Sequence, residues 1–234
     1  MFKAPLVVGY KGEIGSFILG GLLKVMDKAV NIYCFDINET EEEKVERIIK
    51  SDVIFLCVPL QETIPWLEKY KPLLNDKLII EQCSLKQDLF ENKVCEGLRI
   101  SSMHILFRPS ATPDFKDRRC VFMGGAYLTE FEKNVLPSVI KVMTQSEIIM
   151  WDNYEIHDIF MAFEQALVHR VILTLSGILA EHAGGHTYMS AKIGELARRI
   201  YSGDKELYKK IQDNKFFDEV LQTFKEKLDQ FEIK

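Results

Sequence analysis

The sequence predicts an α/β protein with a mostly parallel sheet over residues 1–150, followed by an all-helical domain over residues 151–234. Three observations favour this fold class. Short apolar runs alternate with amphipathic segments in the first part, which is the rhythm of βαβ units. The runs are continuously rich in Val, Ile, Leu and Phe, as in parallel strands that are covered on both faces. After Trp151 only helix-like segments follow, so we expect a domain boundary near residue 150.

Seven apolar runs of the first part are predicted strands, and Pro59 and Gly124–Gly125 mark strand ends. The strands are Pro5–Tyr10, Asn31–Asp36, Asp52–Pro59, Lys77–Ser84, Arg99–Phe107, Arg119–Gly124 and Glu147–Trp151. Segments with a helical pattern lie between them. They are Glu13–Val25, Glu41–Lys50, Gln61–Leu73, Lys86–Glu91 and Thr129–Met143.

The second part begins with a proline-free segment from Tyr154 to about Ala183. It is apolar on too many sides for a solvated helix, so we expect it to be buried in a helical domain or in a subunit interface. Gly184–Gly185 should end this helix. Three further helices are predicted, at His186–Ser202, Lys205–Asp213 and Phe216–Gln230.

Composition narrows the class of protein. Of the 234 residues, 47% are hydrophobic, and the formal net charge of −5 argues against a nucleic-acid partner, because phosphate binding needs a basic surface. None of the five cysteines forms a C-x-x-C pair, which predicts free thiols in a reducing cytoplasm and no metal site. We see no signal peptide and expect no apolar stretch near the ~20 residues of a membrane span. These features predict a cytoplasmic protein without a membrane partner.

The stretch from Leu6 to Gly15 combines a strand, a glycine turn and a helix start, the context of a Rossmann-type dinucleotide site. Gly12 lets the backbone approach a pyrophosphate, Gly15 lets helix and strand pack closely, and the helix N-terminus favours phosphate. Tyr10 stands where the fingerprint has its first glycine, and Gly9 comes just before it. The predicted cofactor-binding residues are Gly9, Tyr10, Gly12, Glu13, Ile14, Gly15, Asp36, Val58 and Pro59.

Asp36 ends the second predicted strand, where an acid can bind both ribose hydroxyls of a dinucleotide. A carboxylate there repels a 2′-phosphate, and neither Ile37 nor Asn38 adds positive charge, so NAD is favoured over NADP. The alternative is a glycine turn and a solvated acid in some other α/β protein.

Four further segments resemble prephenate dehydrogenases, in the order that this family shows. Ile80–Lys86 (Ile-Glu-Gln-Cys-Ser-Leu-Lys) is similar to the family's strand end with Ser-x-Lys. Ser102–Pro109 is similar to its His-Pro-Met-Phe-Gly-Pro. His157–His169 resembles the family's His-Asp followed by Ala-Phe, Gln-Ala-Leu and a final His, and Arg199–Tyr208 resembles its Arg segment with a later Asp and Leu-Tyr. The resemblance spans about residues 5–210, with Ile105 and Arg108 replacing the family's Pro and Gly.

The resemblance implies NAD-dependent oxidative decarboxylation of prephenate in tyrosine biosynthesis. The hydroxyl proton of the substrate needs a base, and histidine suits this role because its pKa lies near working pH. We expect His104 and Ser84 to be catalytic, with Ser84 either contacting the substrate or orienting His104. His169, Arg199 and Arg108 are the predicted substrate-binding residues, and Arg199 offers a bidentate fork for a carboxylate. The alternative for Arg108 is a surface arginine after a strand, without a role in substrate binding.

The family further implies an active site between the two domains and a homodimer formed by the helical domain. Many relatives carry a fused chorismate mutase or regulatory domain, and we expect none here. Three alternatives stay open. Arogenate in place of prephenate is the narrowest. A related two-domain dehydrogenase, such as a β-hydroxyacid dehydrogenase or an imine reductase, is the second. The third is an NAD-binding regulator without catalysis, which the altered positions Tyr10 and Arg108 keep open.

Overall fold

A computed structural model describes residues 2–111, 114–125, 127–182, 187–203 and 205–230 of the protein. The chain divides into two compact units, Met1–Tyr154 and Glu155–Lys234. The division lies a few residues beyond the position near residue 150 that the composition suggests. The predicted glycine stop at positions 184–185 lies outside the described residues.

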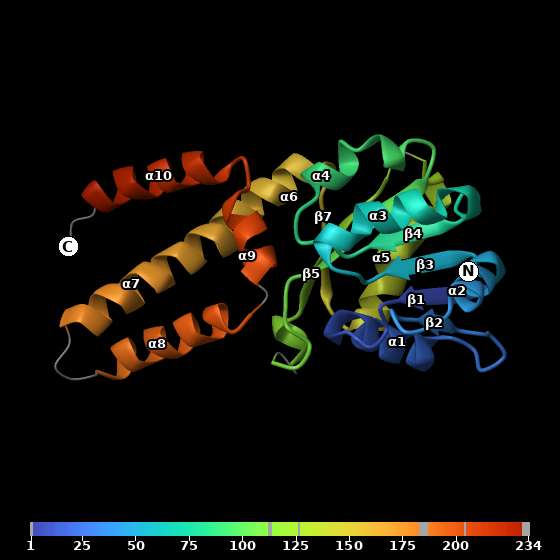
Figure 1. The fold of residues 1–234 in the computed structure, drawn as a ribbon, viewed down its shortest axis with the longest axis horizontal. Coiled ribbons are helices and arrows are strands. Elements are labelled where there is room, and N and C mark those ends of the chain that lie inside the picture. Colours follow the sequence, from blue (N-terminus) through green and yellow to red (C-terminus); the bar gives the residue numbers. More distant parts are fainter. Residues whose placement is uncertain (1, 112–113, 126, 183–186, 204, 231–234) are drawn as a thin grey trace. The chain divides into compact units, whose positions relative to one another are not determined.

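The first unit is built on one seven-stranded sheet with the order β2-β1-β3-β4-β5-β6-β7 (Figure 1). Its strands are β1 Pro5–Val8, β2 Tyr33–Phe35, β3 Val53–Leu56, β4 Leu78–Glu81, β5 Arg99–Ile105, β6 Arg119–Met123 and β7 Glu147–Met150. All pairs are parallel except β5 with β6, so the prediction of a mostly parallel Rossmann-type sheet is confirmed. The connection from β5 to β6 carries only a 3-10 turn, Phe115–Asp117, in its described part, whereas a parallel pair usually needs a crossover helix.

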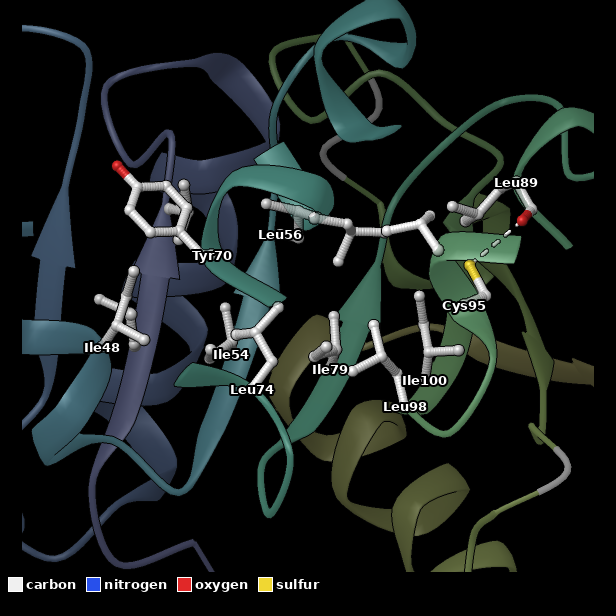
Figure 2. Close-up of a cluster of buried hydrophobic side chains, with 14 of the residues drawn as sticks. Ile48, Ile54, Leu56, Tyr70, Leu74, Ile79, Leu89, Cys95, Leu98 and Ile100 are labelled. Atoms are coloured by element: carbon white, nitrogen blue, oxygen red, sulfur yellow. Dashed lines mark hydrogen bonds between the residues drawn. The ribbon is translucent and has the colours of Figure 1, made fainter. Parts of the chain in front are cut away.

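Helices cover both faces of this sheet. They are α1 Glu13–Val25, α2 Glu41–Lys50, α3 Leu60–Tyr70, α4 Gln87–Phe90 and α5 Glu130–Thr144, with 3-10 turns at Lys71–Leu73 and Lys93–Cys95. One apolar cluster joins α1 and α5 to the sheet, and a second joins α2, α3 and α4 to its other face. Figure 2 shows the second cluster, where the Cys95 thiol donates to the Leu89 carbonyl at 3.1 Å. All five cysteines are free.

Local signals explain where several helices begin. Thr40 and Thr129 each form a capping box, with Glu43 and Glu132 respectively, at the starts of α2 and α5. Gly21 allows α1 to pack closely on α5, because a Cβ at this position would lie 2.4 Å from the Met143 carbonyl oxygen. The predicted starts and ends of α1 and α2 are those of the structure.

The described part of the second unit is helical. It contains the remainder of α6 Tyr154–Met161, a π-helical segment Ala162–Leu167, α7 Val168–His182, α8 Tyr188–Tyr201, α9 Lys205–Gln212 and α10 Phe217–Asp229. In this unit α8 lies beside α7, and α9 and α10 pack on the π-helical segment (Figure 1). Gln212 donates through its side-chain amide to the Ala166 carbonyl at 2.7 Å. The predicted single helix is therefore interrupted by a wider turn that α9 stabilises.

The long helical segment is only partly buried within its own chain, and its burial in a subunit interface stays a prediction. Phe163, Leu175 and Ile178 are 41%, 41% and 50% exposed. The span Tyr154–Glu181 has 28 residues and a mean hydropathy of 1.3, with 17% of its most apolar window buried. By length and composition alone it is long and apolar enough to cross a membrane, so the expectation that no stretch approaches this length is wrong. A single such helix is weak evidence for a span, because the core helix of a soluble protein can have the same length and composition.

Candidate active site

The residues predicted for the site in the first unit follow strands whose carboxyl ends share one edge of the sheet. Strands β1 to β5 run parallel to one another, and β2 and β3 flank β1 on opposite sides. The strand order therefore reverses at β1, and ligands of open α/β sheets bind in the crevice outside such a reversal. Hereafter this side of the sheet is called the carboxyl edge.

The glycine turn after β1 closes tightly because of Gly9. This residue has φ +76°, and a Cβ here would lie 2.4 Å from the Cys57 carbonyl oxygen after β3. Gly15 is equally constrained, since its Cβ would lie 2.1 Å from the Gly9 carbonyl oxygen. Gly9 thus takes the left-handed conformation one position before the place of the fingerprint's first glycine. Tyr10 is accommodated because its own position does not need a positive φ.

The start of α1 is suited to phosphate. Its N-cap residue Gly12 is extended and makes no side-chain capping bond, so no N-cap side chain competes for the amides of the first turn. These amides and the positive end of the helix dipole point to the carboxyl edge. Glu13 and Ile14 are the first two residues of the helix, and Gly15 lets its first turn approach the strand. These residues fit the pyrophosphate of a dinucleotide.

Asp36 is tied to the glycine turn. Its Oδ2 accepts a hydrogen bond from the Lys11 backbone N–H at 3.0 Å, and its own N–H donates to Glu39 Oε2 at 2.8 Å. The carboxyl end of β2 and the turn after β1 are thus brought together, as the fingerprint requires. Positive charge does reach this corner, from Lys11, whose Nζ lies 4.0 Å from Glu39, and from Lys44, whose Nζ donates to the Ile37 carbonyl. Lys11 and Lys44 therefore add positive charge that residues 37 and 38 alone do not provide.

The other predicted residues of the first unit lie at the same edge. Val58 follows β3, with its Cγ1 3.7 Å from the Cβ that an alanine at Gly9 would carry, and Pro59 is the N-cap of α3. Ser84 is half-buried in the turn after β4. His104 is the penultimate residue of β5 and is 8% exposed.

Arg108 lies against the start of α1. Its Nε donates to Glu13 Oε2 at 3.2 Å, and the Ser110 hydroxyl and N–H donate to Glu13 Oε1 at 2.6 and 3.0 Å. Partial burial raises the pKa of Glu13, but the hydrogen bonds from Ser110 and Arg108 outweigh this and lower it. These bonds hold the loop after β5 against the N-terminus of α1.

Two residues without a role in the sequence analysis are the most unusual in this region. Glu81, the last residue of β4, and Lys86, just before α4, form an ion pair of 2.7 Å with both side chains fully buried. Lys86 lies in the Ser-x-Lys segment, but sequence gives no sign that it is buried. The available signal in the sequence was an acid at the end of the apolar run Leu78–Glu81 and a lysine five residues later.

The candidates of the second unit each interact with a neighbour of their own. His169 on α7 is half-buried and packs edge-on against Tyr208, with ring centroids 4.9 Å apart. Burial lowers its pKa. Arg199 on α8 is exposed and pairs with Glu195 one turn earlier at 2.6 Å. His157 and Asp158 are buried and hydrogen-bonded at 2.8 Å, which supports a structural role for both.

Comparisons with known proteins agree with this description. Residues 24–102 match the family model for the prephenate dehydrogenase nucleotide-binding domain. The match begins after the glycine turn and ends two residues before His104, so these two features lie outside it. No curated protein sequence matches the chain significantly.

Solved structures share the fold at low sequence identity. A prephenate dehydrogenase from Aquifex aeolicus, in complex with hydroxyphenyl propionate and NAD+, has a TM-score of 0.73 and 17% identity, covering 98% of this chain and 89% of that one. A Corynebacterium glutamicum protein provisionally named a prephenate dehydrogenase has a TM-score of 0.71 and 17% identity, with coverage of 97% and 81%. A pyrroline carboxylate reductase from Plasmodium falciparum with NADP bound has a TM-score of 0.55 and 15% identity, with coverage of 98% and 91%. Through residues 24–102, this chain is similar to the nucleotide-binding domain of prephenate dehydrogenases.

Proposed function

We propose that the protein is an NAD-dependent prephenate dehydrogenase, which converts prephenate to 4-hydroxyphenylpyruvate and CO2 in tyrosine biosynthesis. One observation carries the proposal. A glycine turn closed by Gly9, an acid at the end of β2 and a histidine at the end of β5 share the carboxyl edge of a sheet whose residues 24–102 match this family. Dinucleotide binding and proton abstraction therefore have candidates at the same edge.

NAD is the proposed cofactor. The uncapped α1 N-terminus fits the pyrophosphate, and Asp36 fits the ribose hydroxyls. Lys11 and Lys44 bring positive charge close to this corner, but both are engaged, with Glu39 and with the Ile37 carbonyl. The carboxylates of Asp36 and Glu39 thus disfavour a 2′-phosphate.

The chemistry assigns a task to each candidate side chain. The bound cofactor supplies the acceptor for the hydride that leaves C4 of prephenate. His104 takes the proton of the C4 hydroxyl, and loss of the ring carboxylate as CO2 makes the ring aromatic. Ser84 donates a hydrogen bond to the substrate or orients His104. His169 and Arg199 bind polar ends of the substrate, Arg199 as a fork for a carboxylate.

We further propose a homodimer formed by the helical unit in the cytoplasm. Several large apolar side chains of α6 and α7 are exposed, namely Ile156, Ile159, Val168, Leu175 and Ile178. Exposed apolar patches often mark interfaces. A second copy covers such a patch symmetrically.

A four-way assay tests the activity. Purified protein is mixed with prephenate or arogenate and with NAD or NADP, and absorbance of the reduced cofactor is followed. We expect turnover with prephenate and NAD. Turnover with arogenate alone keeps the mechanism and changes the substrate, and turnover with NADP alone contradicts the role given to Asp36.

The alternatives predict other outcomes. The first alternative is a related two-domain dehydrogenase, because the protein shares its fold with a pyrroline carboxylate reductase. Such an enzyme would show no turnover with prephenate or arogenate. A non-catalytic regulator binds NAD, detected by quenching of protein fluorescence, without turnover, and its properties do not change with His104→Asn.

A further inference from the structure

The buried Glu81–Lys86 pair at the carboxyl end of β4 is costly to maintain. Glu81 Oε1 and Lys86 Nζ are 2.7 Å apart, and both side chains are 0% exposed. Removing two charges from water costs more than their attraction returns unless further hydrogen bonds help, and apolar replacements of similar volume are often neutral or stabilising. A pair retained in this position therefore calls for a role other than stability.

The pair encloses the peptide that leads to Ser84. Glu81 Oε2 accepts the Cys83 N–H at 2.6 Å, and Lys86 Nζ donates to the Cys83 carbonyl as well as to Glu81. Both polar groups of the Cys83 backbone are thus bound by charged side chains. The Cys83 side chain is fixed too, with Sγ 3.2 Å from Thr63 Oγ1. Because the Cys83 carbonyl belongs to the peptide bond with Ser84, its orientation sets where the Ser84 side chain begins.

The same pair lies on the sheet face of His104. Glu81 is paired with Ser102 in the parallel β4–β5 ladder, so their side chains share a face. Side chains alternate along a strand, so His104, two residues after Ser102, returns to that face. Neighbours offset by two residues on adjacent strands remain within reach of long side chains. The pair is therefore placed between the turn that carries Ser84 and the strand that carries His104.

We infer that Glu81 and Lys86 are positioning residues for the reaction: they hold the Cys83–Ser84 peptide so that the Ser84 hydroxyl and His104 meet the same substrate atom. Neither residue touches the substrate. The inference rests on the proposed function, and it adds to that function a rigid support beneath one side of the site. Such support matters because a displacement of about 1 Å at a reacting group can cost about 100-fold in rate.

A matched control lies at the opposite, amino end of the same strand, β4. Lys77, just before β4, is half-buried and donates to the Ser51 carbonyl at 2.6 Å and to the Ile49 carbonyl at 3.2 Å. It holds backbone as Lys86 does, yet it lies at the amino end of the strand. Lys77→Met removes a backbone-binding lysine without touching the carboxyl edge.

The test compares Glu81→Leu/Lys86→Met with Lys77→Met, Ser84→Ala and the triple variant with Ser84→Ala. Single variants are avoided because they leave one buried charge unpaired. Hydrogen exchange of peptides covering residues 82–86, measured by mass spectrometry, reports on the turn without any need for turnover. Thermal melting and NAD affinity report on the fold, and kcat and KM on the reaction.

We expect the double variant to melt close to the wild type, to bind NAD normally and to lose protection at residues 82–86. Its kcat should fall about 10- to 100-fold with KM nearly unchanged. In the Ser84→Ala background the two substitutions should add no further loss, because they act through Ser84. Lys77→Met should keep both the protection and the wild-type kcat.

Several results would overturn the inference. Unchanged exchange at residues 82–86 shows that the pair does not hold the turn. Increased exchange with wild-type kcat shows that the turn needs no such support, and a full further loss in the Ser84→Ala background shows that the pair acts elsewhere. A wild type without turnover on either substrate ends the proposed function, while the exchange measurement still decides whether the pair holds the turn.

A second variant guards against failure of the first to fold. Glu81→Lys/Lys86→Glu keeps two opposite charges, but the new Lys cannot accept the Cys83 N–H and the new Glu cannot donate to its carbonyl. We expect the same loss of protection and of kcat. Wild-type kcat in this folded variant contradicts the inference.

Discussion

The two units differ in how completely they bury their apolar side chains. In the first unit β1, β3 and β4 are buried along their whole length, because helices cover both faces of the sheet. In the second unit the long helical segment leaves Leu175 and Ile178 41% and 50% exposed. The central strands of the first unit are thus covered on both faces within the chain, whereas the long helical segment of the second unit leaves large apolar side chains exposed.

Buried polar groups differ in the same way. In the first unit Glu81, Lys86, Ser102 and His104 gather at the carboxyl edge of the sheet. In the second unit the buried Asn214 side chain donates to the Asp158 carbonyl at 2.7 Å, a bond between helical segments. The gathering at the carboxyl edge supports the proposed division of roles, with chemistry in the first unit and substrate binding and assembly in the second.

The largest expected effect separates chemistry from binding. His104→Asn should lower kcat by a factor of about 100 to 10,000, the usual contribution of a general base, with NAD affinity nearly unchanged. The matched histidine of the second unit, in His169→Asn, should act mainly through KM. Steady-state kinetics and NAD titration measure both. Equal losses of kcat in the two variants would contradict the assignment of chemistry to the first unit and substrate binding to the second.

The next effect concerns assembly. Leu175→Glu/Ile178→Glu places two carboxylates on the exposed apolar face of α7 and should convert a dimer into a monomer, because burying unpaired charge in an interface costs several kcal/mol. Light scattering after size exclusion gives the mass. Ile49→Glu, at a 59% exposed position on α2, is the matched change in the first unit and should leave the mass unchanged. If the α7 variant keeps the mass of a dimer, this face is not the interface. If the wild type is recovered with membranes, lipid and not a second copy covers the apolar face.

A third prediction probes the glycine turn. Gly9→Ala forces a side chain into a positive-φ position 2.4 Å from the Cys57 carbonyl oxygen, so it should destabilise the first unit by about 2–4 kcal/mol and abolish NAD binding. Gly20→Ala, inside α1 with open space at its Cβ, should instead stabilise the protein by up to ~1 kcal/mol. Urea unfolding and NAD titration give both values. A tolerated alanine at position 9 argues against the turn geometry.

The smallest effect is a pH dependence of the second unit. Burial lowers the pKa of His169 below its ordinary value of 6.5, so the unfolded chain takes up this proton at a higher pH than the folded chain. The stability contributed by neutral His169 is present above the unfolded pKa and is lost as the pH falls through it toward the folded pKa. Urea midpoints should therefore fall more steeply below about pH 6.5 in the wild type than in His169→Phe. Parallel curves for the two proteins would show that His169 titrates normally.

Much of the fold was predictable because its signals are local. The start of α1 after Gly12 and the capping box of Thr40 and Glu43 are short-range features, and they define helices at the predicted residues. The continuous apolar runs predict covered parallel strands in the same way. The antiparallel direction of β6 was not predictable, since one apolar run looks the same in either direction.

The positions of the candidate site residues along the strands were predictable, but their contacts were not. Asp36 and the glycine turn meet as expected, through the bond from Lys11. The role of Gly9 in place of the glycine missing at Tyr10 appears only from its φ and from the nearby Cys57 carbonyl. Arg108 was expected to face a substrate carboxylate, and its partner in the structure is Glu13, from the other end of the unit's chain. Whether it also contacts substrate remains a prediction.

The sequence by itself determined the strand–helix rhythm, the glycine turn, the acid after β2 and the order of family motifs, because each depends on residues close together along the chain. Tertiary structure decided which distant residues meet. It buries the ion pair of Glu81 and Lys86 and brings Arg108 into hydrogen-bond contact with Glu13. It also forms the π-helical segment Ala162–Leu167, where the Gln212 side chain donates to the Ala166 carbonyl. These contacts join residues of different elements, and no local preference encodes them, since burial and partnership are properties of the folded chain as a whole.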